Sequence, residues 1–151
     1  MKILAENILS QLENQTRTTK LVGILNLTPD SFSDGGLYFS EKSAKKQLFQ
    51  LIEDGADIVD IGPESTRPNS NPVDSKEQIE RLKLITSCIK DINIPLSIDT
   101  KSSEVANFAL DNGFTIINDI SGGNNDSKIF DIASKHNATI ILQHSTNKTE
   151  D

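Results

Sequence analysis

Five short apolar runs alternate with amphipathic stretches along the chain. The apolar runs cover residues 20–26, 57–62, 95–100, 115–120 and 138–144. Between them, apolar residues recur at helical spacing, as at Ala44, Leu48 and Leu51. Strands that are apolar without strict alternation are typical of a parallel sheet with both faces covered by protein. The pattern therefore predicts an α/β fold with about five parallel strands and four helices.

The residues at the predicted helix ends agree with this repeat. Asp74 and Glu77 have the spacing of a capping box in front of the second helix. That helix is expected to carry the apolar stripe Ile79, Leu82, Ile85, Ile89 and Ile92. Gly55, Gly113 and Asn137 follow three of the helical stripes, and each is a residue type that adopts the left-handed conformation at a helix end.

Length and charge narrow the class of protein. A chain of 151 residues allows one domain, which we expect to span residues 20–151 after an extension over residues 1–19. The net charge of −7 disfavours nucleic acid and acidic membrane surfaces as partners. No signal peptide or transmembrane run is evident, so we expect a cytoplasmic protein. Cys88 is the sole cysteine and is expected to be buried, while His136 and His144 are expected to be structural or solvent-facing.

Polar residues follow the apolar runs at the point where each predicted strand ends. Asn26 ends the first, residues 64–68 (Glu-Ser-Thr-Arg-Pro) follow the second, Asp99 lies in the third, and Asn118 and Asp119 lie in the fourth. Parallel strands bring their carboxyl ends to one rim, so we expect these residues to converge there. Asn, Thr, Arg and Asp side chains on one rim can recognise a polar ring and an anion.

Each of these residues also has a simpler interpretation. Asp99 could accept two hydrogen bonds from an amino-substituted heterocycle, or cap the third helix. Asn118 suits a ring nitrogen and a carbonyl, or joins strand ends. Arg67 could bind a carboxylate or a diphosphate, or lie in solvent. Asn26 offers one oxygen to Mg²⁺, which is weak support for a metal by itself.

Four motifs, in this order, resemble dihydropteroate synthase. They lie at residues 23–36, 60–68, 97–100 and 117–120. The first two are long and specific, whereas the last two also suit other pterin-binding barrels such as methyltetrahydrofolate methyltransferases. The Thr-Pro-Asp-Ser-Phe-Ser-Asp-Gly-Gly stretch at residues 28–36 favours the synthase.

The resemblance implies a (β/α)₈ barrel of the pterin-binding family and a transferase of folate biosynthesis. Such an enzyme joins 4-aminobenzoate to (7,8-dihydropterin-6-yl)methyl diphosphate and releases diphosphate with the help of Mg²⁺. Asn26 would help bind the metal, Asp99 and Asn118 would hold the pterin ring, and Thr66 would lie in the second loop at the substrate site. On the aminobenzoate side the resemblance places Phe32, Arg67 and Pro68.

The chain departs from the family in three respects. It supplies about five strands of a barrel that needs eight, so the C-terminal strands are absent from it. Pro63 replaces a usual glycine, and Leu-Gln-His-Ser at residues 142–145 replaces a usual Leu-Met-His-Met. Three hypotheses remain open. The first is a synthase half that works only with a complementary C-terminal half carrying the remaining strands. The second is a truncated remnant without turnover, folded partly or through self-association as a homodimer. The third is a methyltransferase fragment, which the first loop disfavours.

Overall fold

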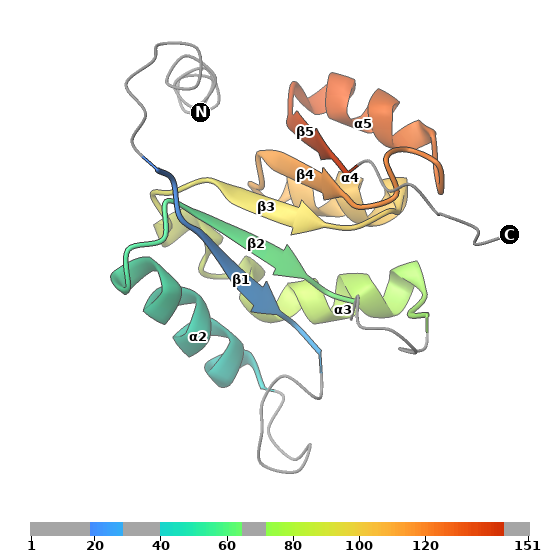
Figure 1. Ribbon diagram of the computed structural model, residues 1–151. Coiled ribbons are helices and arrows are strands. Elements are labelled where there is room, and N and C mark those ends of the chain that lie inside the picture. Colours follow the sequence, from blue (N-terminus) through green and yellow to red (C-terminus); the bar gives the residue numbers. More distant parts are fainter. Residues whose placement is uncertain (1–18, 29–39, 65–71, 144–151) are drawn as a thin grey trace, which may run out of the picture.

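A single parallel sheet organises the chain. The computed structural model describes residues 19–28, 40–64 and 72–143. Its strands pair in the order in which they follow along the chain (Figure 1): β1 (Val22–Asn26), β2 (Ile58–Gly62), β3 (Leu96–Asp99), β4 (Ile116–Asp119) and β5 (Thr139–Leu142). Every neighbouring pair is parallel. The helices between them are α2 (Glu41–Glu53), α3 (Ser75–Thr86), α4 (Ser103–Asp111) and α5 (Lys128–His136). The predicted α/β repeat is confirmed.

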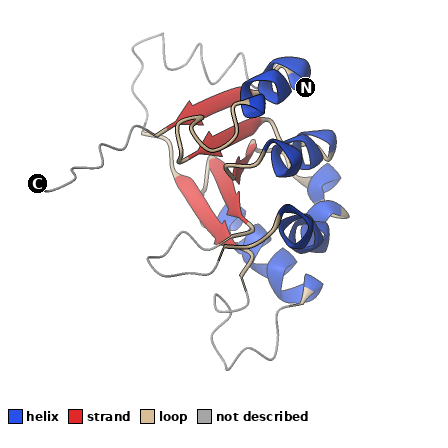
Figure 2. Cartoon of the chain, turned by 90° about the vertical axis from the view of Figure 1, so that its right-hand side faces the viewer, coloured by secondary structure: helices blue, strands red, loops and turns tan. Residues whose placement is uncertain are grey.

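The helices cover one face of a curved sheet and leave the other face open. Figure 2 shows all of the described helices on the convex side of the strands. Ile61, Ile98 and Ile117 are fully buried between the sheet and these helices. On the other face Val22 is 53% exposed and Ile24 is 63% exposed. The expectation that protein covers both faces is therefore wrong for the described residues, because the curvature turns the second face toward a barrel interior.

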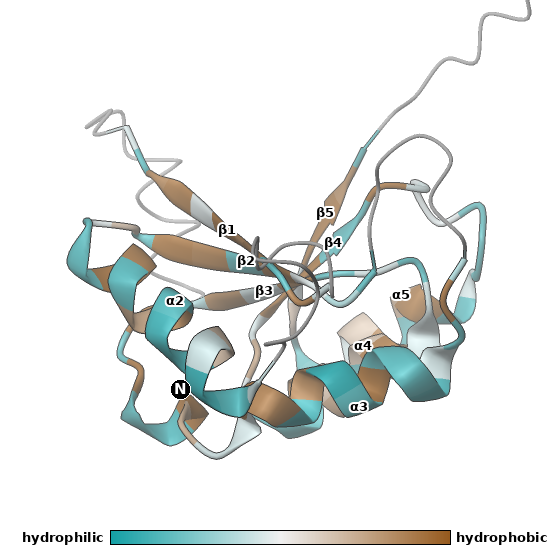
Figure 3. Ribbon diagram, turned by 90° about the horizontal axis from the view of Figure 1, so that it is seen from below, coloured by the Kyte–Doolittle hydropathy of each residue, from teal (hydrophilic) through white to brown (hydrophobic). Residues whose placement is uncertain are grey.

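Exposed apolar side chains lie on the two strands that form the edges of the sheet. Figure 3 shows hydrophobic colour along β1 and β5, whereas the outward sides of α2 and α3 are hydrophilic. In β5, Ile141 is 48% exposed and Leu142 is 46% exposed. The described part of the chain thus has the form of a partial barrel, as predicted, with a packed helical side and an uncovered interior.

Most predicted helix boundaries are confirmed, with two differences. Asp74 caps α3 by accepting a hydrogen bond from the Glu77 backbone N–H at 2.8 Å. The Glu77 carboxylate binds Arg81 one turn further on, so only the first half of the expected capping box forms. The second apolar stripe also splits, because α3 ends at Thr86 and a 3₁₀ turn follows at Ile89–Asp91.

Three residues end helices or turns with left-handed backbone, as predicted. The φ angle is 97° at Gly55, 102° at Gly113 and 51° at Asn137. Cys88 is buried, as expected, and its burial raises the pKa of the thiol. In the part of the chain that the structure describes, no helix has the length and apolar character needed to cross a bilayer. The cytoplasmic location and the boundary after residue 19 stay predictions.

Candidate functional site

Strand register brings polar side chains from four strands onto the open face. Asn26 lies opposite Gly62, Asp60 lies opposite Ser97, and Asp99 lies opposite Asn118. Residues in register on neighbouring parallel strands point to the same face, and successive residues alternate between faces. Because Ile61 and Ile98 point into the helical layer, the side chains on either side of them point into the open interior. The expected convergence of Asn26, Asp99 and Asn118 is what the register produces.

Gly62 leaves room at the centre of this group. A β-carbon placed on Gly62 would lie 3.2 Å from Asn26 Oδ1 and 3.6 Å from Asp99 Oδ2. The two oxygens therefore approach the same glycine from the strands on either side of β2. Any larger side chain at position 62 would fill the space between them.

Asn118 is held by Asp60, which begins the second motif but was not among the predicted site residues. Its Nδ2 donates a hydrogen bond to Asp60 Oδ2 at 2.9 Å. The other carboxylate oxygen of Asp60 is buried and has no partner among the described residues, and the same is true of the Ser97 hydroxyl. Asp60 could have been found from the sequence, since it lies two residues before Gly62 and so shares its face.

Asp99 does not cap helix α4, which was the simpler interpretation of this residue. Helix α4 is capped by Ser102, whose hydroxyl accepts from the Val105 backbone N–H, and not by Asp99. The Asp99 carboxylate makes no hydrogen bond with another described residue. Burial, with the nearby carboxylates of Asp60 and Glu64 adding to it, raises the pKa of Asp99 to about 6. The group is thus ionised at neutral pH and available to a ligand with N–H donors.

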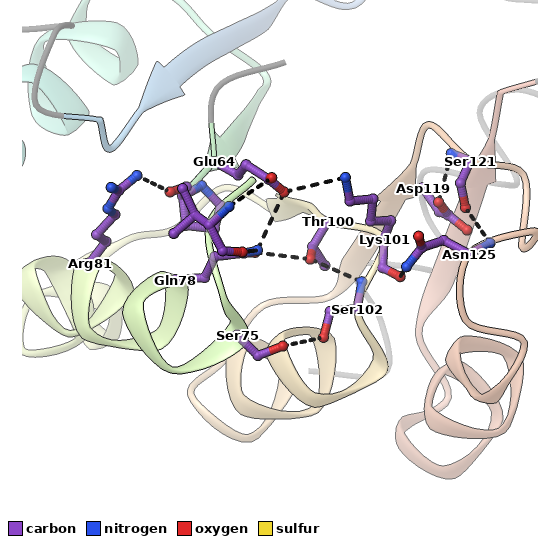
Figure 4. Close-up of polar contacts among 12 residues, drawn as sticks. Glu64, Ser75, Gln78, Arg81, Thr100, Lys101, Ser102, Asp119, Ser121 and Asn125 are labelled. Atoms are coloured by element: carbon purple, nitrogen blue, oxygen red, sulfur yellow. Dashed lines mark hydrogen bonds and ion pairs between the residues drawn. The ribbon is translucent and has the colours of Figure 1, made fainter. Parts of the chain in front are cut away.

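Glu64 joins the rim of the site to the helices beneath it (Figure 4). Its Oε1 accepts from the Val73 backbone N–H at 3.2 Å, and its Oε2 accepts from Gln78 Nε2 at 3.3 Å. Lys101, two residues after Asp99, lies 3.7 Å from the same Oε2. The hydroxyl of Thr100 in turn donates to Gln78 Oε1 at 3.4 Å. This Glu64 cluster links the end of β2, the start of α3 and the loop after β3.

Asp119 belongs to the other face, although it neighbours Asn118 in the sequence. Its side chain is fully buried, and its carboxylate accepts from the backbone N–H groups of Ser121 at 2.8 Å and Gly123 at 2.7 Å. These bonds shape the loop after β4. Figure 4 shows Asp119 and Ser121 of this loop at its right. Asp119 is therefore a structural residue, and the open face takes only Asn118 from this pair.

Other predicted residues lie at the margin of the described chain or beyond it. Phe32, Thr66, Arg67, Pro68 and His144 fall outside the described residues. Pro63 is buried, and its carbonyl accepts from Arg81 Nη1 at 2.7 Å. His136 lies at the end of α5, with its Nε2 3.1 Å from Asn107 Oδ1, which agrees with the structural role expected for it.

The described groups that could hold a metal are the side-chain oxygens of the open face. No group of three or more His, Cys, Asp and Glu side chains with metal-binding geometry occurs within residues 19–28, 40–64 and 72–143. Asn26 Oδ1 and Asp99 Oδ2, on either side of Gly62, are nevertheless hard oxygen donors. Mg²⁺ takes such donors, with few protein ligands and the remainder from water and phosphate. The donor chemistry fits Mg²⁺.

Known proteins are similar to this chain in both sequence and fold. Residues 22–151 match the family model described as pterin binding enzyme. The dihydropteroate synthase of Staphylococcus haemolyticus is 45% identical over 126 residues, which is 83% of this chain and 47% of that protein. The dihydropteroate synthase of Bacillus subtilis is 45% identical over 127 residues, again 83% of this chain and 45% of that protein. The chain spans about half the length of the curated relatives it matches.

Solved structures give the same result. A dihydropteroate synthase from Clostridium difficile, determined in the presence of pteroic acid, superposes with a TM-score of 0.80 and 38% identity, covering 91% of this chain and 54% of that one. The Xanthomonas albilineans enzyme with 4-aminobenzoic acid gives a TM-score of 0.78 at 34% identity, covering 87% of this chain and 48% of that one. These neighbours have the TIM-barrel fold, of which this chain forms a part. The resemblance found in the motifs is confirmed, and the chain belongs to the pterin-binding enzyme family.

Proposed function

We propose that this chain is the pterin-binding part of a dihydropteroate synthase, a transferase of folate biosynthesis. The observation that carries the proposal is the register pair formed by Asp99 and Asn118. Both side chains lie on the open face at the carboxyl ends of β3 and β4. The Asp99 carboxylate has no other partner among the described residues, so its acceptor capacity is left for a ligand. A ring with amino and N–H donors complements that arrangement.

The substrates proposed are (7,8-dihydropterin-6-yl)methyl diphosphate and 4-aminobenzoate. Support comes from solved relatives, one with 4-aminobenzoic acid and one from Anaplasma phagocytophilum with bound 6-hydroxymethylpterin-monophosphate. Asp99 and Asn118 would hold the pterin ring, and Thr66 would lie at the substrate site. For the aminobenzoate side we retain Phe32, Arg67 and Pro68. The amine would then attack the methylene carbon as the bond from that carbon to the diphosphate oxygen breaks.

Mg²⁺ is the cofactor that fits this reaction. Asn26 would hold it together with oxygens of the substrate diphosphate. When bound, the ion supplies positive charge that stabilises the leaving diphosphate. The ionised Asp99 carboxylate near Asn26 adds to the negative potential there, which favours a cation.

The open interior of the partial barrel is proposed to bind a partner. Val22, Ile24 and Ile141 are about half or more exposed on the two edge strands. Exposed apolar side chains beside unpaired strand edges favour association. The partner we expect is a second copy of the chain or a complementary C-terminal half. The molecular mass of the purified chain in solution, measured by light scattering, reports whether copies associate.

The test of the proposed function is diphosphate release. Purified chain is incubated with the pterin diphosphate, 4-aminobenzoate and Mg²⁺, and Asp99→Ala serves as the control for contaminating enzyme. Release that disappears in Asp99→Ala supports the proposal. A folded chain that neither releases diphosphate nor binds the pterin would instead support the remnant hypothesis.

A further inference from the structure

One hydrogen bond on the open face connects two strands that are not neighbours. Asn118 lies on β4 and Asp60 on β2, with β3 between them. The bond from Asn118 Nδ2 to Asp60 Oδ2 nevertheless measures 2.9 Å. On β3, Ser97 faces Asp60 in register and Asp99 faces Asn118, so the bond passes over the strand between these two positions.

The chemistry of the two groups fixes the orientation of the Asn118 amide. The Asp60 oxygen accepts and the NH₂ end of the Asn118 amide donates, because a carboxylate oxygen offers no hydrogen to the amide carbonyl. The carbonyl oxygen of Asn118 must then point away from Asp60. Without Asp60, an amide could rotate by half a turn and exchange its donor and acceptor ends.

We propose that Asp60 is a positioning residue that makes Asn118 present its carbonyl oxygen to the ligand. The site would thereby prefer a heterocycle with an exocyclic amino group over the same ring with a carbonyl in that place. This inference rests on the proposed pterin-binding function and deepens it. It assigns the choice between the two rings to a residue that acts through Asn118.

The surroundings of Asp60 support an indirect role. Its second oxygen, Oδ1, is buried and has no partner among the described residues, so a ligand in the open interior has no direct access to it. The Ser97 hydroxyl beside it is equally enclosed and does not bind it. Asn118 is therefore the donor through which the described structure connects Asp60 to the site. Asp99, in register with Asn118, adds a second acceptor for the same amino group or its ring neighbour.

The experiment compares two ligands that differ at one substituent. The ligands are 6-hydroxymethylpterin and the corresponding pteridine-2,4-dione, in which a carbonyl replaces the amino group. Their dissociation constants are measured by fluorescence titration for the unmodified chain, Asp60→Ala, Asp60→Asn, Asn118→Ala and the double variant Asp60→Ala with Asn118→Ala. Circular dichroism checks that each variant folds, and Asp60→Leu replaces Asp60→Ala if the latter does not.

We expect the preference for the pterin over the pteridine-2,4-dione to fall at least tenfold in Asp60→Ala. Asp60→Asn should retain only part of the preference, since its amide can accept from Asn118 Nδ2 or turn and donate to the Asn118 carbonyl. In the Asn118→Ala background, removing Asp60 should change the preference no further. Two results would overturn the positioning role while leaving the proposed function in place. One is equal weakening of both ligands in Asp60→Ala, and the other is a loss of preference on removing Asp60 from Asn118→Ala as large as the loss in the unmodified chain. Failure of the unmodified chain to bind the pterin would overturn the proposed function, and this inference with it.

Discussion

Asn26 and Gly62 face each other across β1 and β2, so that a β-carbon on Gly62 would lie 3.2 Å from Asn26 Oδ1. The same β-carbon would lie 3.6 Å from Asp99 Oδ2. Gly62 does not have a positive φ angle, so its backbone permits alanine. The absence of a side chain at this position therefore serves the space between two proposed ligand-binding residues and not a turn.

Gly62→Ala should weaken ligand binding while leaving the free energy of unfolding nearly unchanged. The added methyl group presses on Asn26 Oδ1 and fills the space beside Asp99 Oδ2, and we expect it to weaken binding of 6-hydroxymethylpterin by about tenfold, a cost near 1.4 kcal/mol. The free energy of unfolding should change by less than about 1 kcal/mol, because the backbone is not strained. Fluorescence titration and urea denaturation give the two values. Gly55→Ala is the matched control, since nothing lies within 4 Å of a β-carbon there and its φ of 97° adds strain far from the site. Normal pterin affinity in folded Gly62→Ala would argue against this placement of the ligand.

Asp99→Asn should stabilise the protein at neutral pH. The pKa of Asp99 is about 6 in the folded chain, against about 3.9 for an unperturbed aspartate. The folded state thus binds its proton more tightly than the unfolded state, so this group lowers stability as pH rises from about 4 to about 6. Asparagine removes that loss. With solvent screening of a half-buried group included, we expect a gain of about 1–2 kcal/mol at pH 7.5 and little difference at pH 4. Urea denaturation at both pH values measures it, and a gain of the same size at pH 4 would exclude this cause.

Pterin binding should respond to pH in the opposite direction. The proposed hydrogen bonds to the pterin need the ionised carboxylate, which is lost as pH falls through about 6. We expect affinity for 6-hydroxymethylpterin to fall by about tenfold between pH 7 and pH 5. Asp99→Asn should bind weakly and without this pH dependence. A pH profile that is identical in the two proteins would assign the titration to another group.

Glu64 and Lys101 form an ion pair, and we expect Glu64 to contribute more than Lys101 to the free energy of unfolding. Glu64→Ala removes the acceptor for Val73 N–H and Gln78 Nε2 near the end of β2, and we expect a loss of about 1–2 kcal/mol in the free energy of unfolding. Lys101 is 41% exposed and 3.7 Å from Glu64, so Lys101→Ala should cost less than about 0.5 kcal/mol. Urea denaturation of the two variants compares them directly. Equal losses would mean that the ion pair, and not the backbone and amide contacts, holds this region.

The sequence predicted the architecture well because its signals were local and repeated. Apolar runs, helical stripes and left-handed residues such as Gly113 and Asn137 each depend on a few neighbouring positions. The Glu77 half of the capping box failed because Arg81, one turn further along the helix, competes for the same carboxylate. Neither propensity nor spacing shows which of two available partners a flexible side chain chooses.

The site could be predicted only in part. Its composition depends on which face of the sheet each side chain occupies and on contacts between residues far apart in the sequence. Asp99, Asn118 and Asn26 were identified from their positions at strand ends. Asp119 looked equivalent to Asn118, yet alternation along the strand turns it into the helical layer, where it holds the next loop. Asp60 could have been placed on this face from its spacing to Gly62, but its contact with Asn118, 58 positions away, could not be predicted. Such a contact depends on the order of strands in the sheet, which no single motif contains.

The most direct test of the account is to locate the ligand on the chain. Backbone ¹H–¹⁵N resonances are assigned and followed during titration with 6-hydroxymethylpterin. We predict shifts at the carboxyl ends of the strands, around Asn26, Asp60–Gly62, Asp99 and Asn118. The structure also has a cavity of about 720 Å³ between the end of α3 and the end of α4, lined by Ile89, Lys90, Leu110 and Gly113 among others. Shifts confined to that cavity, with none at the strand ends, would contradict the proposed site.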